Sequence, residues 1–396
     1  MRLYDTARRT VAPFEPPRVV RMYVCGITPY DATHLGHAAT YLTYDLLVRR
    51  LEELGHEVRM VRNITDVDDS ILPKAKELGV PYLELAESET ARFHSDMAAL
   101  EMREPVAEPR ATEAIPHIVE LVARLLERGN AYLTAGAAYF DVSSFPRFGR
   151  LSHYPEDQML RLARARGGDP DDPHRRHPLD FVLWQTSAPD EPAWRAPFGI
   201  GRPGWHIECS AMAMHEHGDT LDLHGGGTDL IFPHHECEIA QSESLTGAPF
   251  ARHWMHSAMV NYEGEKMSKS LGNLVFVSDL LKIADPRAIR LALMRHHYRS
   301  GFEWYDTDLE DGTALLHRLV AAAQRPDGPD PRPFAVAVRD ALDDDLDVPR
   351  ALDALDDLAS AVLSGGSDRT APQVFRETAV LLGLDLIRPI DAAFTS

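Results

Sequence analysis

The sequence has few cysteines, no long apolar run and a shortage of basic residues. Its 396 residues include only three cysteines, Cys25, Cys209 and Cys237. Such a sparse, odd set argues against a disulfide framework and favours a reducing compartment. No uninterrupted apolar stretch is long enough to cross a membrane, and the N-terminus shows no apolar segment typical of a signal peptide. We therefore expect a cytoplasmic protein with no membrane partner.

Basic residues are outnumbered by acidic ones. The chain has 41 Lys and Arg against 61 Asp and Glu, which gives a formal net charge of −20. Phosphate neutralisation dominates broad binding to nucleic acid, so this charge argues against a nucleic-acid partner, although it leaves room for a local basic patch. The hydrophobic content of 44% and the charged content of 26% are those of a globular protein. The length favours two or three domains.

The stretch from Met22 to Ala39 combines a short strand, a glycine-bearing loop and the start of a helix. An apolar run over 19–24 predicts a buried strand, and helical spacing extends to about residue 54. Between them stands His34-Leu-Gly-His37. A helix N-terminus offers free N–H groups to an anion, and imidazoles add donors where phosphate charge develops. Taken alone, the motif is a weak signal, because two histidines at a helix start are more often caps or surface residues.

Strand and helix signals alternate through the first 275 residues. Further strands are expected at 57–61, 138–142, 180–184, 221–227 and 254–260, and helices at 72–100, 112–128 and 236–245. This alternation predicts an α/β fold with a doubly wound, Rossmann-like parallel sheet. Residues 145–178 have the composition of a loop or linker. We interpret them as part of a connective insertion over about 95–200, within a catalytic domain over 1–275.

From about residue 278 onward, strand signals disappear and helical spacing dominates. The segments that show this spacing are 279–284, 287–296, 309–323, 333–342, 348–363 and 372–382. We expect an all-α helical bundle over 276–396. The aspartate-rich run 340–357 is typical of a solvated helix face.

A polar, acidic segment follows the second predicted strand. Asp66, Asp68 and Asp69 stand in it, within Arg62-Asn-Ile-Thr-Asp-Val-Asp-Asp69. In a parallel sheet, such a segment lies at the carboxyl edge where ligands bind. The alternative is that these aspartates cap the next helix, and the sequence leaves both interpretations open.

Four scattered residues have the chemistry of a zinc site: Cys25, Cys209, His234 and Glu238. His234 and Glu238 are four residues apart near a helix start, so both can face one point. Cys209 begins another helix, where a thiolate is favoured. Spacing alone supports the site only weakly, because a single cysteine is more often inert and buried, as we expect for Cys237.

A second motif, Lys266-Met-Ser-Lys-Ser270, occurs far beyond the histidine pair. Together the two motifs resemble the HIGH and KMSKS signatures of class I aminoacyl-tRNA synthetases. The segments GWHIECSAMA and HGGGTDLIFPHHECEIAQSE resemble those of cysteinyl-tRNA synthetases. The loop CGITPYDATHLGHAATYLTYD and the element Arg166-Gly-Gly-Asp-Pro170 resemble more closely the mycothiol ligases, the cysteine:glucosaminyl-inositol ligase family. The resemblance covers nearly the whole chain and is weakest towards its C-terminus.

The resemblance implies a class I synthetase-type fold and an AMP-forming carbon–nitrogen ligase. Such an enzyme joins L-cysteine to the amine of glucosaminyl-inositol through a cysteinyl-adenylate, and ATP is a substrate used with Mg²⁺. Zinc on Cys25, Cys209 and His234 would bind the cysteine sulfur, with Glu238 as an additional candidate ligand. The expected partners are therefore small molecules, and a monomer is expected.

The resemblance also implies roles for individual residues. His34 and His37 would stabilise the phosphates during adenylation, and Lys266 and Lys269 would neutralise the leaving pyrophosphate. The positions that match adenylate contacts in the family are Cys25, Gly26, Ile27, Thr28, Thr40, Asn63, Ile64, Thr65, Trp205, Gly227, Thr228, Asp229 and Val260. Core packing is the competing interpretation for the tryptophan and the valine. The family also predicts that residues 263–273 move when ATP binds.

The competing function is that of a short cysteinyl-tRNA synthetase. It predicts charging of tRNA and a basic face on the bundle. The loop over 28–37, the short chain after KMSKS and the acidic charge weigh against it. A non-catalytic, synthetase-like binding protein is expected to have lost some motif histidines, motif lysines or zinc ligands, and this chain keeps them all.

Overall fold

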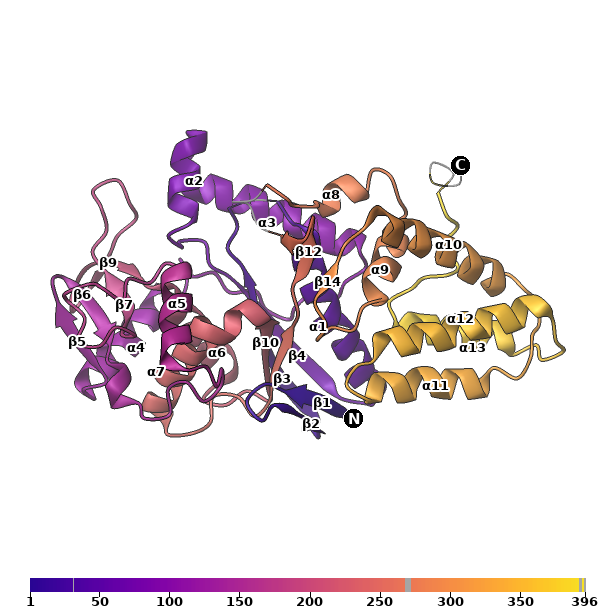
Figure 1. The fold of residues 1–396 in the computed structure, drawn as a ribbon, viewed down its shortest axis with the longest axis horizontal. Helices are drawn as coiled ribbons and strands as arrows, with labels where there is room; N and C mark the ends of the chain where they lie inside the picture. The colour runs from indigo at the N-terminus through magenta and orange to yellow at the C-terminus, as the bar shows by residue number, and fades with distance from the viewer. Residues whose placement is uncertain (31, 268–271, 392–393, 395–396) are drawn as a thin grey trace.

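The computed structural model describes residues 1–30, 32–267, 272–391 and 394 (Figure 1). At its centre lies a four-stranded sheet in the order β11-β10-β3-β4, and all neighbouring strands are parallel. Its strands are β3 (Val19–Ile27), β4 (Glu57–Ile64), β10 (Leu223–Gly227) and β11 (Trp254–Ser257). The predicted parallel α/β sheet is confirmed.

The strand–loop–helix unit at the start of the chain organises this sheet. β3 continues three residues beyond the predicted strand, and its register with β4 shifts between Val24 and Ile27. The chain then enters α1 (Leu35–Glu53), which is buried along most of its length. α1 lies between the sheet and the C-terminal helices (Figure 1), so apolar residues occur on more than one of its faces.

Between β4 and β10 the chain forms a second, antiparallel sheet, seen at the left of Figure 1. In spatial order its strands are β5 (Ala131–Thr134), β6 (Ala137–Phe140), β7 (Phe181–Gln185), β9 (Gly199–Pro203) and β8 (Trp194–Ala196). The prediction of an irregular segment over 145–178 is wrong in part, because it contains α5 (Glu156–Ala165). This helix begins after Pro155 and buries Met159 and Ala163, an amphipathic pattern hidden among charged residues.

The predicted single helix over 72–100 is wrong, because the chain forms two helices there. α2 (Ile71–Leu78) ends at Gly79, which has a φ of 68°, and α3 (Tyr82–Ala99) begins after Pro81. Glycine accepts the left-handed conformation at a helix end, and proline cannot continue the hydrogen-bond ladder. Three further helices are α4 (Ile115–Glu127), within the insertion, and α6 (Trp205–His217) and α7 (Glu236–Thr246), which follow it.

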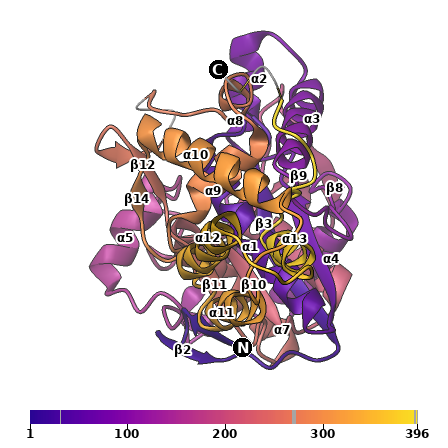
Figure 2. The same cartoon turned by 90° about the vertical axis from the view of Figure 1, so that its right-hand side faces the viewer.

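The C-terminal part is helical, as expected, with one exception. Its helices are α8 (Val277–Leu280), α9 (Pro286–Met294), α10 (Asp306–Ala323), α11 (Arg332–Asp343), α12 (Val348–Ser364) and α13 (Ala371–Leu381). Figure 2 shows α11, α12 and α13 as neighbours viewed nearly end-on. The exception is β14 (Phe302–Glu303), which pairs with β12 (Val260–Tyr262), and β12 pairs in turn with β13 (Glu265–Lys266). The predicted strand over 254–260 is therefore two strands, β11 and β12.

One hydrophobic cluster runs from the parallel sheet through α1 into the C-terminal helices. A buried ion pair joins Arg290 of α9 to Asp45 of α1 inside this contact. A hairpin of β1 (Arg2–Asp5) and β2 (Thr10–Pro13) completes the fold. None of the described helices combines the length and apolar character that crossing a bilayer requires.

Candidate active site

The end of β3 lies against the end of β4. The amide of Gly26 donates to Asn63 Oδ1 at 2.9 Å, and a Cβ on Gly26 would lie 1.6 Å from the Asn63 carbonyl oxygen. Only glycine allows this approach. The hydroxyls of Thr28 and Thr65 lie 2.7 Å apart, and the amide of Thr65 donates to the carbonyl of Ile27. The segments 25–28 and 63–65, predicted as two separate contact sets, thus form one edge of the sheet.

The two motif histidines lie together at the start of α1. His34 is the N-cap residue, and its Nδ1 accepts a hydrogen bond from the Gly36 amide at 3.1 Å. The ring centroids of His34 and His37 are 4.0 Å apart. Both imidazoles therefore stand where the helix N-terminus favours an anion.

The glycines of β10 lie close to α1. The buried Tyr44 hydroxyl accepts from the Gly226 amide at 2.6 Å and lies 2.8 Å from the Met255 carbonyl oxygen. A Cβ on Gly225 would lie 2.4 Å from that hydroxyl, so the close approach needs glycine. A short 3₁₀ turn over Thr228–Leu230 follows β10. The strand thus presents Gly227 and the turn at the same sheet edge as β3.

The remaining predicted contacts are more dispersed. Thr40 Oγ1 of α1 lies 3.0 Å from Ser257 Oγ at the end of β11. Val260 is buried in the hydrophobic cluster, which agrees with the core-packing interpretation. Of the motif lysines, Lys266 is the second residue of β13, and Lys269 lies outside the described residues. Residues 268–271 of the predicted mobile segment, 263–273, also lie outside them.

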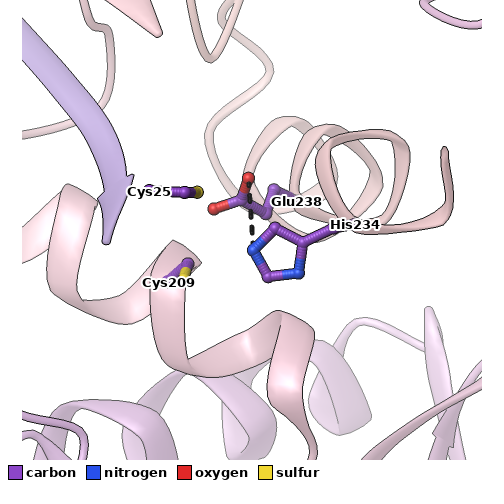
Figure 3. Close-up of side chains that lie close together, drawn as sticks. All are labelled: Cys25, Cys209, His234 and Glu238. Atoms are coloured by element: carbon purple, nitrogen blue, oxygen red, sulfur yellow. Dashed lines mark ion pairs between the residues drawn. The ribbon is translucent and has the colours of Figure 1, made fainter. Parts of the chain in front are cut away.

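The four candidate metal ligands converge on one point, although each comes from a different element. Figure 3 shows Cys25 near the end of β3, Cys209 on α6, His234 in the helical turn Ile231–His235 and Glu238 in the first turn of α7. All four are buried, and one ligand atom from each lies within 4.8 Å of all the others. His234 Nε2 lies 3.9 Å from Glu238 Oε2.

The electrostatics of this cluster fit a cation. Burial raises the pKa of the Cys25 and Cys209 thiols and of Glu238, and lowers the pKa of His234. Among the described residues, His234 Nε2 and both Glu238 oxygens have no hydrogen-bond partner. Buried polar atoms without partners are costly. A neutral imidazole, two cysteine thiolates and a carboxylate are donors that zinc prefers, and these four residues supply them once the thiols and the carboxyl lose their protons.

Sequence reasoning missed further histidines around this point. His224 Nε2 lies 3.1 Å from Glu238 Oε2, closer than His234, and His235 Nε2 lies 3.3 Å from Cys25 Sγ. Together Cys25, His224, His235 and Glu238 form a second set of potential ligands. The signals were present as His-Gly-Gly-Gly after an apolar run and as a pair of adjacent histidines.

A cavity of about 780 Å³ opens beside the cluster. Its wall includes Thr28, Trp205 and Asp229 from the predicted contact set. Trp205 is the first residue of α6, and its ring centroid lies 4.2 Å from that of His234. Volumes of this order are typical of small-molecule sites. The cavity therefore lies along the carboxyl edge of the sheet, and Trp205 stands between it and the metal-ligand cluster.

Comparison with known proteins bears on what this edge does. The family model of the class I tRNA synthetase (C) catalytic domain matches residues 11–314. A protein of Thermobispora bispora is 50% identical over 98% of this chain and 96% of its own length, and one of Mycobacterium ulcerans is 49% identical over the same shares. Both are named L-cysteine:1D-myo-inositol 2-amino-2-deoxy-alpha-D-glucopyranoside ligase. The chain belongs to this ligase family.

Comparison with solved structures shows that other proteins share the fold of this chain. Methionyl-tRNA synthetase of Mycobacterium tuberculosis, in complex with methionyl-adenylate, matches with a TM-score of 0.68 at 19% identity. The match covers 94% of this chain and 91% of that one. A putative arginyl-tRNA synthetase of Campylobacter jejuni matches with a TM-score of 0.61 at 13% identity, covering 93% of each chain. The class I synthetase fold is therefore confirmed for this ligase.

Proposed function

We propose that this enzyme joins L-cysteine to the amine of glucosaminyl-inositol in two steps. ATP and cysteine first form cysteinyl-adenylate and pyrophosphate. The amine nitrogen then attacks the acyl carbon, the bond to the phosphate oxygen breaks, and AMP leaves with the electron pair. The product is the cysteinyl amide of the amino sugar, an intermediate of mycothiol biosynthesis.

One observation carries this proposal. A buried cluster of two thiols, an imidazole and a carboxyl stands at the carboxyl edge of a class I synthetase sheet. The chain around it is about half identical to named cysteine ligases over nearly its whole length. The cluster explains why the amino acid is cysteine, and the relatives' names supply the acceptor.

We assign the metal to zinc, held by Cys25, Cys209 and His234, with the substrate sulfur as the fourth donor. Bound there, zinc would supply a soft cation that binds a thiolate but not the hydroxyl of serine. Glu238 remains the additional candidate, and its contact with His224 supports a role in orienting the ligands. A purely apolar pocket distinguishes substrates by only about 1–3 kcal/mol per methylene.

We assign the adenylation chemistry to the sheet edge. The imidazoles of His34 and His37, at the start of α1, would hold the ATP phosphates with Mg²⁺, and Lys266 and Lys269 would neutralise the leaving pyrophosphate. The adenylate would lie against a set of residues at the ends of β3, β4 and β10 and near them. That set is Cys25, Gly26, Ile27, Thr28, Thr40, Asn63, Ile64, Thr65, Trp205, Gly227, Thr228, Asp229 and Val260.

Three further assignments accompany the reaction. The catalytic unit would be residues 1–275, with the insertion at about 95–200, and residues 276–396 would form the bundle that supports α1. Contacts between α1 and the C-terminal helices support this role of the bundle. The enzyme would act as a monomer in the cytoplasm, where cysteine thiols stay reduced.

The test is AMP release by the purified enzyme supplied with ATP and L-cysteine. Glucosaminyl-inositol is added to one sample and total tRNA to another. Stimulation by the amino sugar alone is expected. Stimulation by tRNA, with formation of cysteinyl-tRNA, would instead identify a short cysteinyl-tRNA synthetase.

A further inference from the structure

The cavity beside the metal-ligand cluster extends well beyond the positions assigned to the adenylate. Its lining includes Thr28, Trp205 and Asp229 from that set. The rest of the lining, which we call the second side, includes residues 68–70 after β4, residues 166–168 after α5, and Gln185 at the end of β7. An acceptor that attacks the acyl carbon has to approach from open space next to the adenylate. This second side of the cavity is such a space.

The second side has the chemistry of a site for a polyhydroxylated ligand. Aromatic rings of Tyr30, Phe148 and Phe181 line it, and such rings cover the apolar faces of sugars. Polar groups of Ser70 and Gln185 stand among them. Arg166 ties residues 166–168 to the neighbouring turn, because its guanidinium donates to the carbonyls of Asp229 and Phe232. This part of the lining is therefore held in place by hydrogen bonds and carries polar groups.

Four carboxylates line the cavity, and in Asp69 and Asp180 both oxygens have partners. Asp69 forms an ion pair with Arg202 and accepts from Gln185. Asp180 accepts from the Tyr132 hydroxyl at 2.7 Å and from two backbone amides at 2.9 Å each. Asp229 follows Gly227 among the positions assigned to the adenylate.

Asp68 is the fourth carboxylate, and it is held differently. Its Oδ1 accepts from the amide of Ser70 at 2.8 Å and from the hydroxyl of the same residue. Within the ranges that the structure describes, its Oδ2 receives no hydrogen bond, while the residue lines the cavity. The carboxylate is therefore fixed through one oxygen and offers the other.

We propose that this side of the cavity is the acceptor subsite, and that Asp68 binds the incoming amino sugar in its ammonium form, which gives up one proton to solvent before the nitrogen attacks, and so selects an amine over a hydroxyl. The proposal rests on the proposed function, because it names where the second substrate of that reaction binds. Asp68 acts here as a specificity-determining residue.

The surroundings of Asp68 agree with a cationic ligand. Burial raises the pKa of Asp68, and Asp69 beside it acts in the same direction. Glu208 of α6 and Asp66 are further carboxyl groups close by, burial raises the pKa of both, and Arg202 of β9 is the opposing cation. A bound ammonium would offset the cost of keeping Asp68 ionised there.

The experiment compares the variant Asp68→Asn with the wild-type enzyme in its metal-loaded form. Asparagine keeps the shape and the Oδ1 acceptor for Ser70 but removes the charge. Cysteine-dependent exchange of pyrophosphate into ATP measures the first half-reaction without acceptor. AMP release against glucosaminyl-inositol concentration measures the second, and inhibition by glucosyl-inositol, which carries a hydroxyl in place of the amine, measures sugar binding without the ammonium.

The matched control is Asp190→Asn. Asp190 carries the same charge and is exposed, it pairs with Lys76 at 3.0 Å, and it is not among the residues that line the cavity. This control separates a local contact from a general change of charge in the insertion.

In Asp68→Asn we expect pyrophosphate exchange within about twofold of wild type and a KM for the amino sugar about tenfold to a hundredfold higher, the range for a lost hydrogen bond to a charged group. Inhibition by glucosyl-inositol should be unchanged, so the preference for the amine disappears. Asp190→Asn should match the wild type in every assay.

Four outcomes would overturn the proposal. They are an amino-sugar KM within twofold of wild type, loss of exchange, a raised KM for cysteine in exchange, and an equal effect of Asp190→Asn. A raised KM for cysteine would assign Asp68 to the amino acid. If the wild-type enzyme itself released no AMP with the amino sugar while exchange continued, the proposed function would fail, and that result is distinct from the others.

Discussion

Replacing Tyr44 by phenylalanine should weaken both the fold and the adenylation step. The Tyr44 side chain is 1% exposed. Its hydroxyl accepts from the Gly226 amide at 2.6 Å and lies 2.8 Å and 3.0 Å from the carbonyls of Met255 and Gly226. The hydroxyl has a single proton, so it donates to one of these two carbonyls at a time while it accepts from the Gly226 amide. It therefore makes two hydrogen bonds at once. It thereby ties α1 to β10 and β11.

The magnitude follows from what the substitution leaves behind. In Tyr44→Phe the buried amide of Gly226 loses its partner, which costs about 1–3 kcal/mol. The carbonyl of Met255 loses a neutral hydrogen bond, worth about 0.5–1.5 kcal/mol. We expect the free energy of unfolding to fall by roughly 2–3 kcal/mol. A displacement of about 1 Å in a positioning element can cost about a hundredfold in rate, so exchange of pyrophosphate into ATP should fall by at least about tenfold.

Denaturant unfolding and pyrophosphate exchange measure the two effects. The control is Tyr4→Phe, because the Tyr4 hydroxyl makes no hydrogen bond to the part of the chain that is described. Its unfolding midpoint and its exchange rate should be those of the wild type. If Tyr44→Phe unfolded within about 0.5 kcal/mol of the wild type, the assigned cost of the orphaned Gly226 amide would be refuted.

Three further substitutions test other parts of the account. Cys209→Ser should lower bound zinc measured by elemental analysis and abolish pyrophosphate exchange, and full exchange in the metal-free variant would contradict the assignment. Arg166→Lys should lower the thermal midpoint by a few degrees and reduce kcat, because lysine cannot bridge the carbonyls of Asp229 and Phe232 as the guanidinium does. Burial raises the pKa of Asp96 from 3.8 to about 6. The folded state therefore binds the proton of the Asp96 carboxyl more tightly than the unfolded state does. The contribution of this proton to folding stability is complete below pH 3.8 and is lost as pH rises through about 6. Asp96→Asn should unfold at a higher temperature than the wild type at pH 7, and its unfolding temperature should change less between pH 4 and pH 6. An unfolding temperature that follows the wild-type pH dependence would contradict the raised pKa of Asp96.

The sequence was sufficient for the parts of the fold that have strong periodicity. The strand over 19–24 and the helix after it are found as β3 and α1, because a continuous apolar run and 3.6-residue spacing are distinct signals. The short strands β8, β9 and β14 were missed, since two to five residues carry no period. The helix α5 was missed because two buried residues among arginines and aspartates resemble a loop in composition.

The candidate site divides in the same way. Cys25, Cys209 and His234 come together only through the pairing of β3 with β10 and the packing of α6 on α7. No spacing in the sequence encodes that meeting, so they were found through the resemblance to a family. The histidines 224 and 235 were missed for the same reason. The aspartates after β4 had two open interpretations. The N-cap residue of α2 is Ser70, and Asp66 accepts instead from the amide of Thr112 at 2.9 Å, so the capping interpretation is not confirmed, while Asp68 lines the cavity.

The central claim is that Cys25, Cys209 and His234 hold a zinc ion that binds the sulfur of the substrate. X-ray absorption at the zinc edge of the purified enzyme tests it directly, because zinc–sulfur distances of about 2.3 Å are distinct from those to nitrogen or oxygen. The account predicts two sulfur neighbours in the free enzyme, three after addition of L-cysteine, and two after addition of L-serine. A sulfur number that stays the same with L-cysteine would contradict it.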